Sequence, residues 1–140
     1  MSEVLRPAGR YESVVIHQGI AYVSGQLPRT GNQLEFVGRI GRELTLEEGC
    51  IAARLCAARA LTVLEQALGG RMRIIRLLRV TGHVSGLEGF TQQSIVLDAA
   101  SAYFEQELGP QGAHARTACG VYNLPQGAPV CIEVQAAVRD

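Results

Sequence analysis

The residue best suited to chemistry in this sequence is Arg116, near the start of a short apolar run reading Ala-Arg-Thr-Ala-Cys-Gly-Val. An arginine inside an apolar strand is costly to bury unless an anion meets it. Its planar guanidinium can hold a carboxylate through two parallel hydrogen bonds. We therefore expect Arg116 to bind either the carboxylate of a small ligand or an acidic side chain, such as Glu133.

Other reactive groups are scarce. All 13 basic residues are arginine, so there is no lysine that could form a Schiff base. The four cysteines form no CxxC pair and lack a histidine at metal-ligand spacing, so we expect no metal site. Cys119 and Cys131 could face each other across neighbouring strands, but thiols in a reducing compartment are most often small buried hydrophobes.

The elements that must position these residues follow from periodicity, capping and turn signals. Thr45 and Glu48 have the spacing of a capping box and open a helix that Gly69 and Gly70 stop. A second helix is expected from about residue 91 to 108. Alternating or β-branched patterns predict strands at residues 14–16, 20–23, 35–37, 74–85, 116–122 and 130–138.

The order of these elements predicts a single α+β domain over residues 1–140, a sheet of about five to six strands with two helices on one face. In the last strand the even-numbered residues point toward the helices, while Cys131 and Glu133 point the other way. Arg116 and Ala118 share a face of the preceding strand, and we expect that face to be the same second one. Polar residues there indicate a surface that is either hydrated or covered by another subunit.

The composition and net charge of the chain argue against some classes of function. A net charge of zero and 5% aromatic residues argue against a nucleic-acid-binding protein. No apolar run is long enough to span a membrane. The first residues show no signal peptide, so we expect a cytoplasmic protein.

Several short motifs follow one another in a recognisable order: Gly9 and Tyr11, then Ser24-Gly25-Gln26, then Ala115-Arg116, Val121 and Leu124-Pro125. In this order the sequence resembles the RidA/YjgF family, whose pattern is GxY…SGQ…ARxxxxVxxLPxxxxVEIE. The family comprises reactive-intermediate deaminases, also called endoribonuclease L-PSP or translation-inhibitor proteins. Segments 44–49 and 89–93 resemble a slightly longer branch of it.

The resemblance implies a chorismate-mutase-like fold and a homotrimer whose sheets form a central barrel, with sites in three clefts between subunits. The family's reaction is hydrolysis of reactive 2-imino acids to 2-keto acids and ammonia, without metal or organic cofactor. By resemblance Arg116 binds the carboxylate of this small substrate. The other implied substrate-binding residues are Tyr11, Ser24, Gly25, Gln26, Thr117 and Ala118.

Cys131 departs from the family pattern. Val-Glu-Ile-Glu aligns onto residues 130–133, so a cysteine replaces the glutamate that positions the hydrolytic water in the family. A neutral thiol is a poor general base. Glu133 lies two residues on, roughly 6–7 Å along the same strand face, and could either take over the water or pair with an arginine. We therefore assign Glu133 to catalysis with Arg116, and Cys131 to substrate binding.

Two alternatives stay open. The loss of the glutamate at Cys131 favours a non-catalytic small-carboxylate-binding or protein-interaction member of the family. An endoribonuclease or translation inhibitor would instead use the cluster Arg71, Arg73, Arg76 and Arg79 to contact RNA. The zero net charge favours a solvated sheet edge for this cluster.

Overall fold

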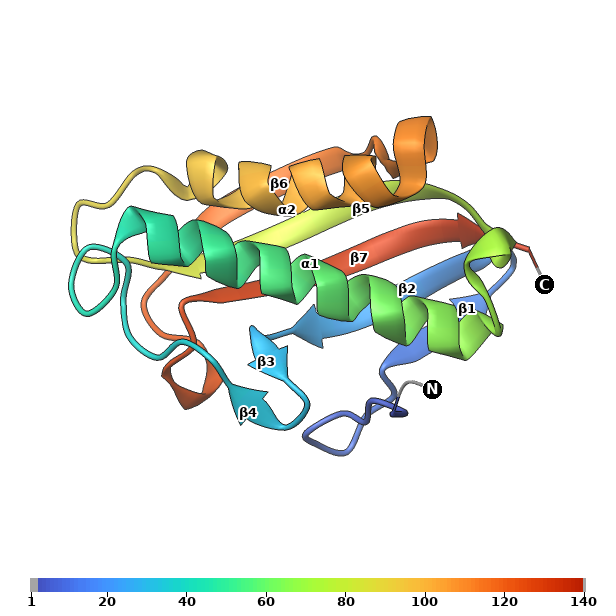
Figure 1. Cartoon of the computed structure of the whole chain (residues 1–140), viewed down its shortest axis with the longest axis horizontal. Helices are drawn as coiled ribbons and strands as arrows, with labels where there is room; N and C mark the ends of the chain where they lie inside the picture. The colour runs from blue at the N-terminus through green and yellow to red at the C-terminus, as the bar shows by residue number, and fades with distance from the viewer. Residues whose placement is uncertain (1–2, 140) are drawn as a thin grey trace.

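A layer of two helices covers one face of a five-stranded sheet in the computed structural model, which describes residues 3–139 (Figure 1). The strand order is β1-β2-β7-β5-β6, and only the β5–β6 pair is parallel. The bounds are β1 Val14–His17, β2 Ile20–Gln26, β5 Ile74–Ser85, β6 Ala115–Val121 and β7 Val130–Val138. The predicted α+β architecture, a sheet with two helices on one face, is confirmed.

The connections explain the strand order. Gln18 and Gly19 both have positive φ (51° and 78°), as a tight two-residue hairpin between β1 and β2 requires. Parallel strands β5 and β6 need a long crossover, which helix α2 (Gln93–Leu108) provides. Strand β7 then returns to the middle of the sheet, between β2 and β5. As a result β6 is left at an edge.

Helix α1 (Leu46–Leu68) begins and ends where its capping residues predict. The Thr45 hydroxyl accepts from the Glu48 N–H at 3.1 Å, and the Glu48 carboxylate accepts from the Thr45 N–H at 2.9 Å. Gly69 closes the helix in the left-handed conformation. Among the helices of residues 3–139, none combines the length and apolar character that a membrane span requires.

The segment after β2 differs from the prediction. Residues 35–37 form no strand; a small hairpin of β3 (Arg29–Thr30) and β4 (Gln33–Leu34) stands just before them. Phe36 supplies the apolar signal in this segment, but it packs as a half-buried side chain against the core. The hydrophobic side chain of Phe36 therefore serves to pack against the core and does not indicate a strand.

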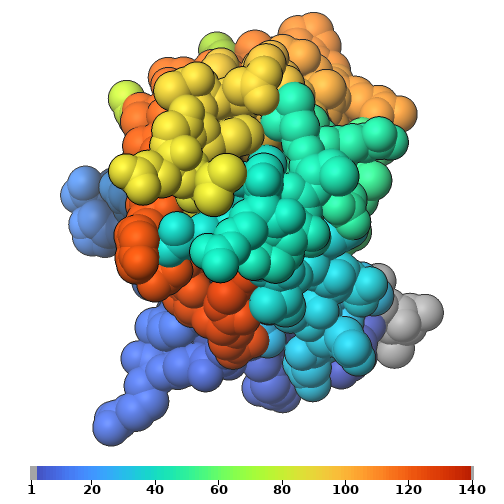
Figure 2. Space-filling model, turned by 90° about the vertical axis from the view of Figure 1, so that its left-hand side faces the viewer, coloured from blue at the N-terminus to red at the C-terminus, as the bar shows by residue number. Residues whose placement is uncertain are grey.

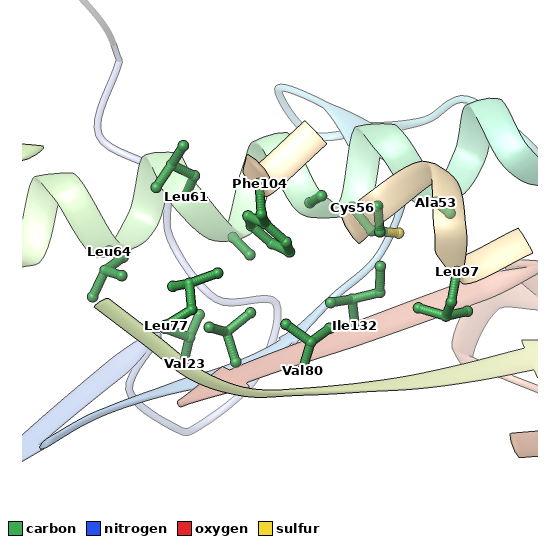
Figure 3. Close-up of a cluster of buried hydrophobic side chains, with 14 of the residues drawn as sticks. Val23, Ala53, Cys56, Leu61, Leu64, Leu77, Val80, Leu97, Phe104 and Ile132 are labelled. Carbon is green, nitrogen blue, oxygen red and sulfur yellow. The ribbon is translucent and has the colours of Figure 1, made fainter. Parts of the chain in front are cut away.

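The core lies between the sheet and the two helices (Figure 3). Val23, Val80 and Ile132 come from three neighbouring strands and meet Leu61 of α1 and other buried side chains. Gly82 is required here because a Cβ on it would overlap the Leu97 side chain of α2. This core fixes α1 over β2 and β7, and α2 over β5 and β6.

Candidate functional site

A pocket of about 550 Å³ opens where the N-terminal segment, the end of β2 and the turn before β7 meet. Four of the predicted substrate-binding residues line it: Tyr11, Gly25, Gln26 and Cys131. In Figure 2 the N-terminal segment (blue) lies below the turn that precedes β7 (red). The structure thus brings together residues that lie 120 positions apart in the sequence.

A break in strand pairing shapes the floor of this pocket. Strand β2 pairs regularly with β7 up to Val23, and pairing resumes at Gln26 after an irregularity that holds Ser24 and Gly25. A Cβ on Gly25 would lie 2.7 Å from the Sγ of Cys131. Glycine is therefore needed because the two strands approach closely where β2 bulges.

Ser24 supports the pocket wall and does not line the cavity. Its hydroxyl donates to the Glu12 carbonyl at 2.7 Å, and its N–H donates to the Ser13 carbonyl at 2.9 Å. These bonds hold the segment that carries Tyr11, whose side chain is half exposed. The tyrosine phenol is thereby placed at the pocket mouth, where it can donate a hydrogen bond to a ligand or a water.

Gln26 is buried and orients an arginine that the sequence analysis did not single out. Its Nε2 donates to the Ser24 carbonyl at 2.9 Å, and its Oε1 accepts from Arg59 Nε at 3.2 Å. Arg59 lies on α1 and lines the pocket. Its position could have been noticed, because Arg59 falls between Cys56 and Val63 on the stripe of α1 that faces the core.

Cys131 presents a neutral thiol to the pocket. Burial raises the pKa of this thiol to about 11, and the nearby Glu133 carboxylate adds to the rise. At neutral pH the group is therefore neither a nucleophile nor a base. Glu133 is exposed on the sheet face away from the helices, next to Cys131 along β7 but outside the pocket lining.

Arg116 lies at the other side of the molecule and on the other face of the sheet from Glu133. It pairs in register with Val80, a core residue, so its side chain is on the helix side, against α2. The expectation that Arg116 shares a face with Glu133 is wrong. Side chains alternate along a strand, so the sequence shows which residues of one strand share a face, but not which face of the sheet that is.

The Arg116 guanidinium is already engaged by side chains of α2. Its Nη1 donates to Asp98 Oδ1 at 2.9 Å and to Ser101 Oγ at 3.0 Å. Its Nη2 donates to Ser94 Oγ at 2.8 Å. Among residues 3–139 the acidic partner of Arg116 is thus Asp98. Arg116 and Asp98 also line an open groove with His114, whose ring contacts Ser101 Oγ at 2.9 Å.

The two residues after Arg116 point to opposite faces. Thr117 is exposed on the outer face and accepts a hydrogen bond from Arg79 at 2.8 Å. Ala118 packs against the core on the helix side. Neither lines the pocket with Tyr11 or the groove beside Arg116.

The predicted site is therefore split into two parts. The pocket with Tyr11 lies at the ends of β2 and β7, and the Arg116 groove lies on the edge strand β6, with β5 between β7 and β6. One copy of the chain does not bring Arg116 to the pocket.

Two other sequence expectations can be compared with the structure. Cys119 and Cys131 do not lie on adjacent strands, since β5 separates them and its His83 pairs in register with both. The four cysteines are free. Within residues 3–139, no group of three or more His, Cys, Asp or Glu side chains is arranged to hold a metal ion.

The arginine cluster of residues 71–79 is bonded mostly within the chain. Arg71 forms ion pairs with Glu65 and Glu107, and its hydrogen bond with Glu65 is the main cause of its raised pKa. Arg76 donates to two backbone carbonyls, and Arg79 to a threonine hydroxyl. Strand β5, which carries Arg76 and Arg79, lies inside the sheet, so the expectation of a sheet edge is wrong for these two residues.

Fold and sequence together identify the class of protein. The profile of the family described as “YjgF/chorismate_mutase-like, putative endoribonuclease” matches residues 1–135. The chain belongs to this family, as its ordered motifs indicated.

Relatives agree with this assignment. Protein TCP17 of Trypanosoma cruzi is 39% identical over 134 residues, which cover 95% of this chain and 82% of that protein. Atu1372 of Agrobacterium tumefaciens, a solved structure of unknown function, aligns with a TM-score of 0.90 at 33% identity, covering 93% of this chain and 83% of that one. Escherichia coli TdcF, solved with bound serine, shares the fold with a TM-score of 0.65 at 18% identity, covering 98% and 94%.

Proposed function

We propose that the protein is an imine and enamine deaminase that hydrolyses reactive 2-imino acids to 2-keto acids and ammonia in clefts between the subunits of a homotrimer. The observation that carries the proposal is the division of the site. The pocket with Tyr11 and Cys131 lies at the ends of the interior strands β2 and β7, and the family arginine Arg116 lies on the edge strand β6. A head-to-tail ring of copies joins two different surfaces of neighbouring chains, and a ring that joins these two surfaces would contain both parts in each cleft.

The outer face of the sheet supports association of this kind. It carries large apolar side chains that stay exposed in one copy, among them Val15 (51%), Tyr22 (46%) and Leu78 (36%). Exposed apolar patches commonly mark protein–protein interfaces. A barrel of sheets in a trimer would cover this face.

The proposed reaction needs a bound carboxylate, a water and a proton path. Arg116 holds the 2-carboxylate, and water adds to the imine carbon. The resulting carbinolamine transfers its hydroxyl proton to nitrogen, and ammonia leaves as the C–N bond breaks. The Cys131 thiol, with a pKa of about 11, cannot accept the proton from water at neutral pH, so the base in this scheme is Glu133. Tyr11 donates to the departing nitrogen or to the water.

A second function is favoured by two specific observations: a non-catalytic carboxylate-binding protein. Cys131 stands where the family has its water-positioning glutamate, and Glu133 lies outside the pocket lining. TdcF, a protein of the same fold, was solved with bound serine, which carries a carboxylate. Binding without turnover would need Arg116 but not Glu133.

A coupled assay distinguishes the two functions. An amino-acid oxidase generates 2-imino acids in the presence of semicarbazide, and a deaminase lowers semicarbazone formation by hydrolysing the imine first. We expect the wild-type protein to lower it, Arg116→Gln to abolish the effect and Glu133→Gln to weaken it strongly. Arg54→Gln, a charge loss on the exposed side of α1, is the control. No effect of the wild-type protein on any imino acid, together with Arg116-dependent binding of 2-keto acids, would establish the binding protein instead.

A further inference from the structure

Arg59 is a buried cation without an acidic partner. It is 9% exposed, and the hydrogen bonds it donates go to neutral oxygens. Its Nε donates to Gln26 Oε1 at 3.2 Å and its Nη1 to the Gly31 carbonyl at 2.7 Å. Within residues 3–139 no ion pair includes Arg59. Buried charges are ordinarily paired with an opposite charge. The Arg59 guanidinium has no such partner among residues 3–139.

One nitrogen of Arg59 is available to a ligand. Its Nη2 donates no hydrogen bond within residues 3–139. In that part of the chain no fully buried side-chain nitrogen or oxygen lacks a partner, so Nη2 must keep some exposure. Arg59 also lines the pocket, which is the concave space next to this guanidinium.

The rest of the lining adds to the positive charge of the pocket. Arg6 and Arg29 also line it, whereas no aspartate or glutamate among the described residues does. Burial lowers the pKa of Arg59, and the nearby charge of Arg29 lowers it further. Neither Arg6 nor Arg29 belongs to an ion pair of residues 3–139. Three uncompensated cations around one concave site attract anions.

We propose that Arg59, assisted by Arg29, binds a second anionic group of the ligand, so that the preferred ligands are dianionic 2-imino or 2-keto acids. The 2-carboxylate of the ligand is held by Arg116 of a neighbouring copy, and this part of the proposal rests on the proposed function. The distal carboxylate or phosphate is held in the pocket, and this part rests on the contacts of Arg59 alone. A planar guanidinium fits either group, and about 550 Å³ is ample for such a small molecule.

Calorimetric titration with three stable probes tests the proposal without requiring turnover. 2-Oxoglutarate carries a distal carboxylate, 3-phosphohydroxypyruvate a distal phosphate, and 2-oxopentanoate has the chain length of the first but no distal charge. We expect at least one dianion to bind wild-type protein about tenfold or more tightly than 2-oxopentanoate, since charge-assisted hydrogen bonds are the strong ones. Whichever dianion is preferred identifies the distal group.

Variants assign the preference to Arg59. In Arg59→Gln the ratio between dianion and 2-oxopentanoate should fall toward one, while Arg54→Gln, the same change on the exposed side of α1, keeps the wild-type ratio. Should Arg59→Gln not fold by circular dichroism, Arg29→Gln on the partly exposed β3 hairpin gives a second readout, a partial fall. Equal binding of all three probes by wild-type protein, or a preference that survives in Arg59→Gln, would overturn the proposal. A dianion preference without imine hydrolysis would refute the deaminase and leave this inference standing.

Discussion

In the proposed function Asp98 competes with the ligand for Arg116, so its removal should tighten carboxylate binding. The Asp98 carboxylate accepts from Arg116 Nη1 at 2.9 Å, where an incoming ligand carboxylate would also bind. Asn at this position keeps the shape and an accepting oxygen but removes the negative charge. Asp98→Asn therefore isolates the electrostatic part of the competition.

The structure sets the size of the effect. The Asp98 side chain is 68% exposed and the Arg116 side chain 20%, so solvent screens the pair and its strength falls in the surface range of about 0.2–1 kcal/mol. Loss of that competition tightens binding of a 2-keto acid by about 1.5-fold to fivefold. Arg116→Gln removes charge-assisted hydrogen bonds worth about 1.5–3 kcal/mol, which weakens binding by about tenfold or more.

Calorimetric titration with 2-oxobutanoate at low and high salt measures both variants. The gain in Asp98→Asn should shrink as salt rises, because screening already weakens the competing pair. Glu105→Gln is the matched control, since Glu105 lines the same groove but makes no ion pair with Arg116. Unchanged or weaker binding in Asp98→Asn, or unchanged binding in Arg116→Gln, would refute the role given to Arg116.

Three further predictions concern the scaffold and the pocket. Gly25→Ala places a Cβ 2.7 Å from Cys131 Sγ and should cost about 1–3 kcal/mol in urea unfolding, most of which Cys131→Ala in the same chain restores; no recovery would contradict the contact. The Cys131 pKa is about 11 against 9.0 for a free thiol, so across that window the folded state binds more protons and the free energy of unfolding falls as pH rises. Cys131→Ala should show a smaller decline over the same pH range, and an identical decline would contradict the assignment. Thr45→Ala removes the α1 cap bond to Glu48 and should cost about 0.5–2 kcal/mol, seen as a lower melting temperature; an unchanged melting temperature would argue against the cap.

Patterns among neighbouring residues of the sequence predicted most of the helices and strands. The alternating residues 130–138 and the β-branched run 74–85 became strands with those bounds, and the capping box at Thr45 opened α1 as expected. These signals depend on neighbours in sequence, which a single chain displays. The strand expected at residues 35–37 failed because one aromatic, Phe36, serves the core without pairing.

The division of the site could not be predicted, because strand order is a property of the whole sheet. Tyr11 and Cys131, both assigned to substrate binding from the motifs, line one pocket. The motifs gave no sign that β7 enters between β2 and β5, which moves Arg116 to the far edge. Arg59 could have been found from the sequence, as an arginine on the buried stripe of a helix, but its missing acidic partner needed the structure.

A mixing experiment tests most directly that the site is completed by two copies. Tyr11→Ala and Arg116→Gln each damage one part of the site, and each alone should lose most imine hydrolysis in the semicarbazide assay. In a trimeric ring, equal co-assembly gives each mixed trimer one cleft with both residues intact, or about a quarter of all clefts. We predict that the co-assembled protein regains about a quarter of wild-type activity. Activity no higher than the mean of the two variants would contradict a site shared between copies.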